Sequence, residues 1–232
     1  MAITPKSQAF VVFDLDNTLF YCPARGKEVY LRRGVPLLLA ALSVVPNIKL
    51  VFWTRADTAY ALYMLKSIEI LQFFDSDSML TMQHCEESKK KYGCYKSCYY
   101  LCDWFCVTKE SVDVVLVDDV PRNGLNSPYD KIIWVLPFSG PLAPVVGDSD
   151  AVFIGQKWNN WQKDIDKKRW KAARTTEAKL ESVAVQNWTS YHKTNIVCIP
   201  AIDMVYVYLM SRYGLTPDQK VVSYTKKYFG YP

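Results

Sequence analysis

The chain has 232 residues and a net charge of +5, with half of its residues hydrophobic and 14% aromatic. This composition excludes a disordered or collagen-like chain and allows one globular domain with an appendage. No apolar run approaches the roughly 18 residues of a membrane span, and the amino terminus lacks a signal-peptide pattern, so we expect a soluble intracellular protein. The seven cysteines, an odd number, favour reduced thiols over a disulfide framework.

The first half of the chain alternates predicted strands and helices. Residues 10–13 and 48–54 are short apolar runs that end in polar side chains, which is typical of strands buried on both faces. Between them a helix is expected at 37–42, with Pro36 in its first turn. A second, amphipathic helix is expected over 57–72, beginning at a capping aspartate.

The same alternation continues further along the chain. An apolar helix is predicted over 94–107, followed by strands at 112–119 and 131–136. Residues 199–213 are expected to form a buried helix. Strands separated by helices indicate an α/β fold with a three-layer, Rossmann-like parallel sheet.

Charge divides the chain into two parts. Residues 1–150 hold 15 basic and 17 acidic side chains, whereas residues 151–232 hold 13 basic and 6 acidic ones. We therefore predict an α/β domain over 1–150 and a basic, aromatic-rich extension over 151–232 that packs on or flanks it. The Lys- and Trp-rich residues 157–179 of the extension could bind nucleic acid, or could form an amphipathic helix docked on the core.

Polar side chains stand where three of the predicted strands end. Asp14 and Asp16 follow the first strand, and Thr54 ends the second. The third strand ends in Asp118 and Asp119. A single Asp-x-Asp pattern could be a solvated turn. The carboxyl ends of parallel strands, however, line the crevice in which open α/β sheets bind ligands, so we expect the three ends to form one site.

Four segments within residues 9–138 complete the pattern, and they are Arg32-Arg33-Gly34-Val35, Trp53-Thr54-Arg55-Ala56, Gly93-Cys94-Tyr95-Lys96 and Val117-Asp118-Asp119-Val120-Pro121. With the strand ends, they resemble the motifs of the haloacid dehalogenase superfamily of aspartate-nucleophile phosphatases. Within that superfamily the chain is most similar to the small RNA polymerase II carboxyl-terminal-domain phosphatases, the NLI-interacting-factor-like family. It departs from them at Asp119, where they have Asn, at Arg55, where they have a small residue, and at 97–98.

The resemblance implies a phosphatase that forms a covalent aspartyl-phosphate and has no large cap domain. Asp14 would be the nucleophile, and Asp16 would protonate the leaving oxygen and then activate water. Thr54 and Lys96 would hold the phosphate oxygens, although the neighbouring lysines at 89–91 are alternatives to Lys96.

The resemblance also implies a Mg²⁺ site. Its side-chain ligands would be Asp14 and Asp119, with Asp118 orienting them, and Asp16 would add its backbone carbonyl. Two further residues are candidates for substrate binding. Thr18 could touch substrate but would more simply support the first loop.

Arg55, the second of these candidates, could grip a second phosphate or merely face solvent. The absence of room for a lid predicts an open site, which favours a large substrate whose own surface excludes water. We therefore expect a protein phosphatase for phosphoserine or phosphothreonine. The alternatives are a nucleotide or polynucleotide end phosphatase, a magnesium-dependent phosphatase of tyrosine or sugar phosphates, and a phosphatase-like module that recruits a partner through residues 151–232.

Four cysteines recur every four residues, at Cys94, Cys98, Cys102 and Cys106. On a helix this spacing advances about 6 Å and rotates about 40° at each step, so the outer thiols would lie roughly 18 Å apart. Zinc requires its sulfur ligands about 2.3 Å from one point. We therefore expect these cysteines to form a buried apolar face rather than a metal site.

Overall fold

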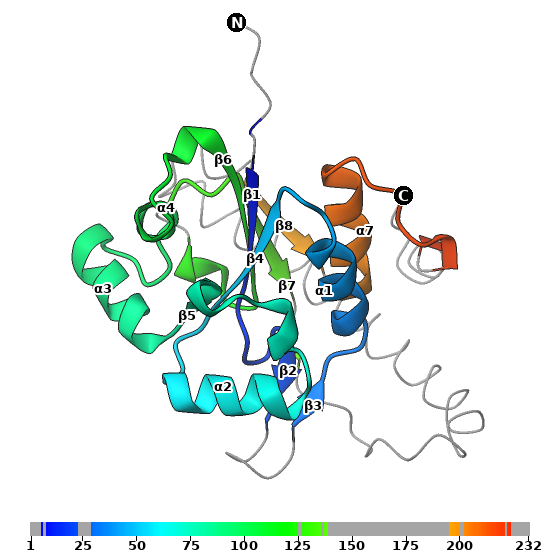
Figure 1. Ribbon diagram of the computed structural model, residues 1–232, viewed down its shortest axis with the longest axis horizontal. Helices are drawn as coiled ribbons and strands as arrows, with labels where there is room; N and C mark the ends of the chain where they lie inside the picture. The colour runs from blue at the N-terminus through cyan, green and yellow to red at the C-terminus, as the bar shows by residue number, and fades with distance from the viewer. Residues whose placement is uncertain are drawn as a thin grey trace, which may run out of the picture.

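The centre of the fold is a six-stranded sheet in which every neighbouring pair is parallel (Figure 1). The computed structural model describes residues 6, 8–22, 29–124, 127–135, 137–138, 195–199, 202–220 and 222–223. The strand order is β5-β4-β1-β6-β7-β8. The strands are β1 Gln8–Phe13, β4 Ile48–Trp53, β5 Met79–Leu80, β6 Val112–Asp118, β7 Lys131–Val135 and β8 Ile196–Ile199. The expected parallel α/β sheet is confirmed.

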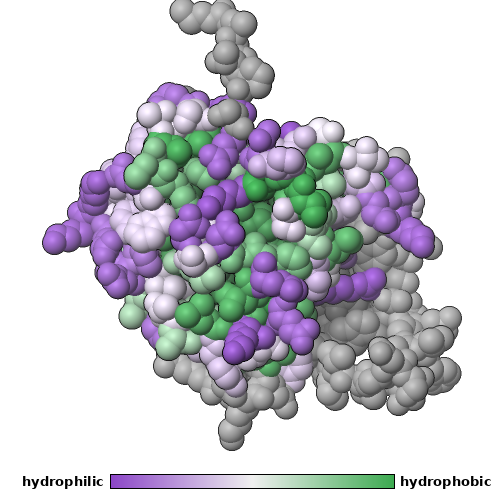
Figure 2. Space-filling view, viewed as in Figure 1, coloured by the Kyte–Doolittle hydropathy of each residue, from purple (hydrophilic) through white to green (hydrophobic). Residues whose placement is uncertain are grey.

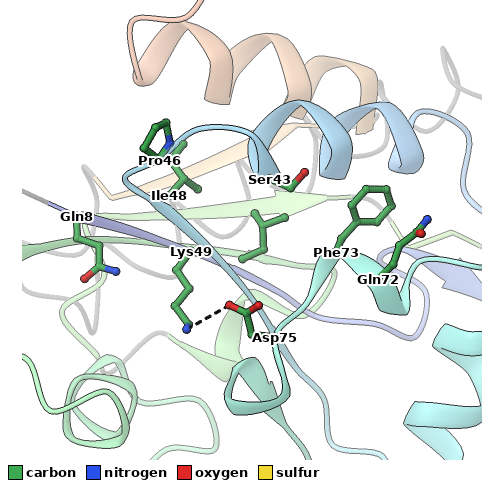
Figure 3. A pocket seen from close by; sticks show the side chains of 9 residues that line it. Gln8, Ser43, Pro46, Ile48, Lys49, Gln72, Phe73 and Asp75 are labelled. Carbon is green, nitrogen blue, oxygen red and sulfur yellow. Dashed lines mark hydrogen bonds and ion pairs between the residues drawn. The ribbon is translucent and has the colours of Figure 1, made fainter.

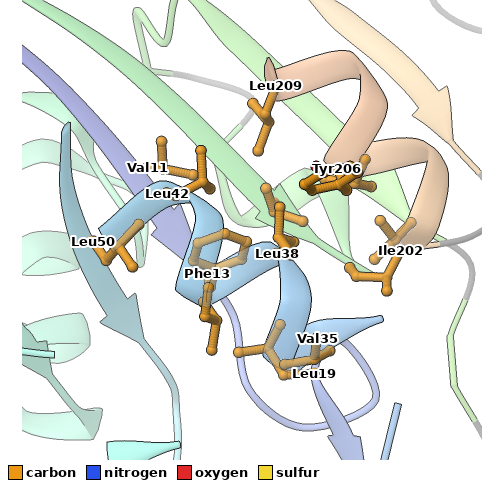
Figure 4. Close-up of a cluster of buried hydrophobic side chains, with 14 of the residues drawn as sticks. Val11, Phe13, Leu19, Val35, Leu38, Leu42, Leu50, Ile202, Tyr206 and Leu209 are labelled. Carbon is orange, nitrogen blue, oxygen red and sulfur yellow. The ribbon is translucent and has the colours of Figure 1, made fainter. Parts of the chain in front are cut away.

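Helices cover both faces of the sheet and give the fold three layers (Figure 1). They are α1 Val35–Ser43, α2 Thr58–Ser67, α3 Met82–Tyr92, α4 Cys98–Trp104 and α7 Ile202–Arg212. Side chains of α1, α2 and α7 belong to one buried cluster, and side chains of α3 and α4 belong to a second. In Figure 4, Leu38 of α1 and Tyr206 of α7 lie beside Phe13 of β1, which shows how the first cluster covers the sheet.

Strand β1 is central because both of its faces are buried. Val11 and Phe13 belong to the first cluster, and Phe10 and Val12 belong to the second. A strand covered on both faces needs apolar residues at every position, which explains the unbroken run in the sequence. The chain leaves this buried strand at Asp14, so its polar residues emerge at the carboxyl edge of the sheet.

A small antiparallel pair of strands, β2 Phe20–Tyr21 and β3 Tyr30–Leu31, connects β1 to α1. Gly34 then begins α1 with a φ of 86°, in the left-handed region that favours glycine. A Cβ atom at this position would lie 2.1 Å from Oδ1 of Asp203 in α7. Gly34 therefore allows both the turn and the close packing of the two helices.

The helix expected over 57–72 is shorter than predicted. Asp57 caps α2 as expected, and its carboxylate accepts a hydrogen bond from the amide of Tyr60. The helix ends at Ser67, because Glu69 adopts a left-handed conformation with a φ of 59°. A separate 3₁₀ turn follows at Leu71–Phe73.

The helix expected over 94–107 is shorter than predicted and covers only Cys98–Trp104. The hydroxyl of Ser88 in α3 donates to the carbonyl of Cys94 and accepts from the amide of Ser97, which holds the segment before α4 in a non-helical form. The expected buried face of four cysteines is confirmed for three of them only. Cys94, Cys98 and Cys102 are buried, but Cys106 lies after the helix, is exposed and has a φ of 54°.

The carboxyl-terminal part contributes to the sheet through a strand that the sequence analysis missed. β8 pairs in parallel with β7, so the predicted helix at 199–213 begins only at Ile202. Residues 139–193, which include the proposed nucleic-acid segment 157–179 and the boundary near 150, lie outside the described residues. The division into two domains stays a prediction.

The hydropathy of the surface differs from one part of the molecule to another. Figure 2 shows hydrophilic side chains at the left of the view, over α3, whose last turn carries Lys89, Lys90 and Lys91. In the ranges that the structure describes, no helix combines the length and the apolar character needed to cross a bilayer.

Candidate active site

The candidate site lies at the carboxyl edge of the sheet, where β1, β4 and β6 end side by side. The amide of Asp14 donates to the carbonyl of Val117 at 2.9 Å, which joins the end of β1 to the end of β6. Thr54 follows β4, and its amide donates to the carbonyl of Leu80 in β5. The predicted strand ends therefore meet at one edge.

Lys96 connects two of these strand ends. Its Nζ atom lies 2.5 Å from Oδ1 of Asp14 and 2.8 Å from Oδ2 of Asp118. The Lys96 side chain is completely buried, whereas the lysines at 89–91 are exposed on α3. The structure thus brings Lys96, and not its neighbours, to the carboxylates.

The non-helical segment before α4 is what places Lys96 there. The amide of Lys96 donates to the carbonyl of Asn123, and its own carbonyl accepts from the hydroxyl of Tyr129. The side-chain amide of Asn123 also donates to both oxygens of Asp118. A buried ammonium needs such fixed partners, because an unpaired charge in the interior is very costly.

Thr18 joins the first loop to the loop after β6. Its hydroxyl accepts from the amide of Asp119 at 3.0 Å and lies 3.2 Å from Oδ2 of Asp14, to which it donates. Arg32 in turn donates to the carbonyl of Thr18. Thr18 is fully buried, so the structure favours the supporting role over direct contact with substrate.

Asp16 occupies a more open position than Asp14 and is held by α2. The hydroxyl of Tyr60 donates to Oδ1 of Asp16 at 2.9 Å. Burial raises the pKa of Asp16 above its ordinary value, although hydrogen bonds from Tyr60 and Thr54 oppose the shift. A carboxyl with a raised pKa that remains partly accessible can exchange a proton with a bound group.

The pKa values of Asp14 and Asp119 are also raised. Burial raises the pKa of Asp14 to about 7 against the charge of Lys96, and Asp118 adds to the increase. Burial and the charge of Asp118 raise the pKa of Asp119 to about 6. Lys96 stays protonated, because Asp118 and Asp14 raise its pKa despite its burial. The negative charge of the cluster therefore exceeds what Lys96 offsets.

Three of these carboxylates suit a divalent cation. One oxygen from each of Asp14, Asp118 and Asp119 can be chosen so that all three lie within 4.8 Å of one another. Mg²⁺ takes oxygen ligands at about 2.0–2.1 Å, so ligands on opposite sides of it lie roughly 4 Å apart. The oxygen donors are therefore of the kind that Mg²⁺ takes, and a cation there would counter the charge of Asp118, which adds to the effect of burial on the pKa values of Asp14 and Asp119.

Three residues of the site escaped the sequence analysis as functional candidates. Tyr60 and Asn123 orient Asp16 and Asp118, and the indole of Trp134 donates to the carbonyl of Asp119. Nothing local in the sequence indicates which carboxylate Tyr60 or Asn123 would meet. Their roles depend on contacts across the sheet.

A cavity in the described residues lies elsewhere. A polar pocket of about 550 Å³ is found at the opposite end of β4, next to Ile48 and Lys49 (Figure 3). Nζ of Lys49 lies 3.4 Å from Oδ2 of Asp75 in this pocket, so the charge of Lys49 already has an ion-pair partner. None of the carboxylates of the candidate site lines it. This cavity and the candidate site are therefore separate.

Comparison with solved structures finds similar chains at low identity. Fission yeast Fcp1 bound to beryllium fluoride, an RNA polymerase II CTD phosphatase, is 18% identical over 64% of this chain and 46% of that chain, with a TM-score of 0.41. A second Fcp1 structure is 18% identical over 68% and 49%, with a TM-score of 0.41. The deoxy-D-mannose-octulosonate 8-phosphate phosphatase of Haemophilus influenzae is 14% identical over 56% and 70%, with a TM-score of 0.38.

The chain therefore spans about half the length of the two Fcp1 chains. No curated protein sequence matches it. A family model described as NLI interacting factor-like phosphatase, in contrast, matches residues 9–150. The match covers more than half of the chain and includes all three strand ends that form the site. The resemblance seen in the sequence is confirmed, and the chain belongs to the NLI interacting factor-like phosphatase family.

Proposed function

We propose that this chain is a Mg²⁺-dependent phosphatase that hydrolyses phosphoserine or phosphothreonine in proteins. The observation that carries the proposal is the contact of buried Lys96 with Asp14 and Asp118, beside the accessible Asp16. In this proposal Asp14, Lys96 and Asp16 would act as the nucleophile, the cation for the phosphate and the proton donor, respectively. Family membership supports the same class of reaction.

Asp14 supplies the nucleophile in this proposal. An Asp14 carboxylate oxygen attacks phosphorus, and the bond between phosphorus and the serine or threonine oxygen breaks. Asp16 gives its proton to that leaving oxygen. Asp16 then takes a proton from water, whose oxygen attacks the phosphorus and releases inorganic phosphate from Asp14. The raised pKa of Asp16 suits a group that must first donate a proton and then accept one.

Lys96 and Thr54 would position the phosphate. The ammonium group of Lys96 has three donors, two of which already point at Asp14 and Asp118, and it can stabilise charge that develops on the phosphate oxygens. Thr54 is buried beside Asp16, and its hydroxyl accepts from the amide of Ala56. The same hydroxyl also donates to Asp16, so in this proposal it would turn its hydrogen to a phosphate oxygen when phosphate binds.

Mg²⁺, held by Asp14, Asp118 and Asp119, would supply a Lewis acid that offsets the charge of the incoming phosphate. Asp118 is oriented for this by Asn123 and by the amide of Val120 at 2.7 Å. Thr18 fixes the distance between Asp14 and Asp119 through its hydroxyl. These supports keep the carboxylates aligned.

A protein substrate suits the open edge of the sheet. Only residues 15–34 lie between Asp14 and α1, and the part of them that the structure describes forms the small strand pair β2 and β3. Such a short insert leaves room for a substrate that brings its own surface to exclude water. A folded or extended phosphoprotein meets this requirement better than a small metabolite.

Hydrolysis of p-nitrophenyl phosphate with and without Mg²⁺, beside the Asp14→Asn variant, tests the reaction. Turnover that needs both Mg²⁺ and Asp14 supports the proposal, and a folded wild-type protein without turnover points to a binding module instead. Phosphopeptides and oligonucleotides with 3′ or 5′ phosphates then test the substrate. Faster turnover of the oligonucleotides would identify a polynucleotide end phosphatase.

A further inference from the structure

Two cations share one aromatic ring at the rim of the candidate site. The Arg55 guanidinium carbon lies 4.1 Å from the ring centroid of Tyr95, and Nζ of Lys89 lies 4.5 Å from it. Lys89 also donates to the hydroxyl of Tyr95 at 2.8 Å. Arg55 and Lys89 are exposed and Tyr95 is half-buried. The ring thus holds two charged ends at the surface in fixed positions.

The chain places this cluster directly beside the catalytic residues. Arg55 follows Thr54, and Tyr95 precedes Lys96. Consecutive Cα atoms are only about 3.8 Å apart, so the backbone of the rim cluster lies next to that of the phosphate-handling residues. A substrate whose phosphate reached Lys96 would therefore pass next to Arg55.

The charge of this cluster is not neutralised by the protein. Within the described part of the chain, neither Arg55 nor Lys89 forms an ion pair with a carboxylate. The hydrogen bond to Tyr95 raises the pKa of Lys89, so Lys89 is charged at neutral pH. Arg55 presents a planar fork of donors whose geometry matches phosphate and carboxylate oxygens.

We propose that Arg55, Lys89 and Tyr95 form a second anion site, which binds a phosphoryl or carboxylate group of the substrate next to the phosphate that is hydrolysed. This inference rests on the proposed phosphatase function and adds a substrate class to it. The preferred substrate is a phosphopeptide with a further acidic group about one to three residues from the scissile phosphate, since extended residues span about 3.3 Å each. Arg55 is the main contact of this further acidic group.

The balance of charge at the site favours a peptide over a nucleic-acid strand. Asp16 and Asp119 lie at the same edge, and a strand with a phosphate on every nucleotide would bring several of its charges near them. A doubly acidic peptide brings only two anions, one for each cationic group. Oligonucleotides are therefore a comparison arm of the test and not part of the proposal.

The test compares kcat/KM for four substrates of matched length. Three are a singly phosphorylated peptide, the same peptide with a second phosphoserine two residues away, and the same peptide with aspartate there. The fourth is an oligonucleotide with one terminal phosphate. Wild-type protein should prefer the doubly anionic peptides by roughly fivefold, and Arg55→Ala should reduce that ratio to about one. Lys66→Ala removes an exposed lysine of α2 and should keep the ratio.

The two acidic peptides identify the source of the anion. Preference for both supports a general anion site, and preference for one assigns it to phosphate or to carboxylate. Equal loss of kcat/KM on every peptide in Arg55→Ala, or no preference in the wild type, would overturn the inference, as would a higher kcat/KM for the oligonucleotide. Failure of the proposed function itself is separate, because it abolishes hydrolysis of p-nitrophenyl phosphate in the wild type.

Ionic strength gives an independent readout. A preference that arises from exposed charges should weaken as salt rises from about 0.05 M to about 0.5 M, because the Debye length falls over this range. A ratio that is insensitive to salt would contradict an electrostatic site. Arg55→Lys keeps the charge and should retain part of the preference, which a purely structural role of Arg55 would not predict.

Discussion

The two ends of the central sheet carry the same kinds of charged residues, but the proportion of cations to carboxylates differs between them. At the amino end, Asp130 is bound by both Lys6 and Lys109, and Asp113 accepts two hydrogen bonds from Arg212. At the carboxyl end, Lys96 contacts two carboxylates, and Asp16 and Asp119 lie nearby. Cations match or exceed carboxylates at the first end, whereas carboxylates exceed cations at the second.

The pKa values follow this balance. Although burial opposes it, hydrogen bonds from Lys109 and Lys6 lower the pKa of Asp130 below its ordinary value. Burial raises the pKa values of Asp14 and Asp119 to about 7 and about 6. The comparison teaches that paired carboxylates stabilise a fold, whereas crowded ones leave a site ready for a cation or a proton transfer.

The largest expected effect is a difference in the free energy of unfolding between variants of Lys96 and Lys109. Lys96→Met should lower the free energy of unfolding by about 3–5 kcal/mol, because it leaves two buried carboxylates without their cation. Lys109→Met should lower it by about 1 kcal/mol, since Lys109 is partly exposed and Asp130 retains Lys6. Urea unfolding followed by tryptophan fluorescence measures both.

A second variant keeps the prediction testable if the Lys96→Met chain does not fold. Adding Asp118→Asn removes one of the two buried carboxylate charges that Lys96→Met leaves unpaired, and it should recover part of the lost stability. Equal effects of Lys96→Met and Lys109→Met would contradict the distinction between the two ends.

Mg²⁺ should stabilise the carboxyl end alone. At about 100 times its dissociation constant, a ligand that binds only the folded chain raises the free energy of unfolding by about 2.7 kcal/mol. Asp119→Ala should abolish most of this response, and Asp119→Asn should keep it, because an amide oxygen can still bind Mg²⁺. Asp113→Asn at the amino end is the matched control, and thermal unfolding with and without Mg²⁺ is the measurement. Loss of the response in this control would contradict a site at the carboxyl end.

Much of the candidate site at the carboxyl end of the sheet could be predicted from the sequence, because a local pattern marks each strand and the polar residue that follows it. Asp14, Thr54 and Asp118 each follow an unbroken apolar run, and the topology of parallel sheets brings such positions together. The sequence pattern also distinguished these strands from helices by their length. The site residues therefore follow from local patterns and one rule of topology.

The parts that escaped prediction depend on contacts between distant residues. The break before Cys98 is held by Ser88 of the preceding helix, and helical spacing alone predicts a continuous helix there. Two of the amino-end pairs, Arg212 with Asp113 and Lys6 with Asp130, join residues about a hundred or more positions apart. β8 is only four residues long, and its place beside β7 is decided by an available sheet edge rather than by its own sequence.

Removal of the charge of Asp130 should affect stability but not catalysis. Asp130→Asn weakens the bonds to Lys6, Lys109 and the amide of Val114, which should cost about 1–2 kcal/mol because the group is only half-buried. Turnover of p-nitrophenyl phosphate at saturating Mg²⁺ should stay within about twofold of wild type, since the change lies at the opposite end of the strands. A large loss of turnover in a folded variant would show that the two ends are coupled.

The smallest expected effect is the pH dependence of the amino end. Because the pKa of Asp130 is lower in the folded chain than its ordinary value of 3.8, the folded state favours the ionised form. Its stabilisation is complete above the unfolded pKa and is lost as pH falls through the folded pKa. Wild type and Asp130→Asn should therefore differ in unfolding free energy at pH 7, and the difference should shrink by less than about 1 kcal/mol as the pH falls below 4. A difference that grows on acidification would mean that Asp130 is destabilised by folding, and the contrast between the two ends of the sheet would then fail.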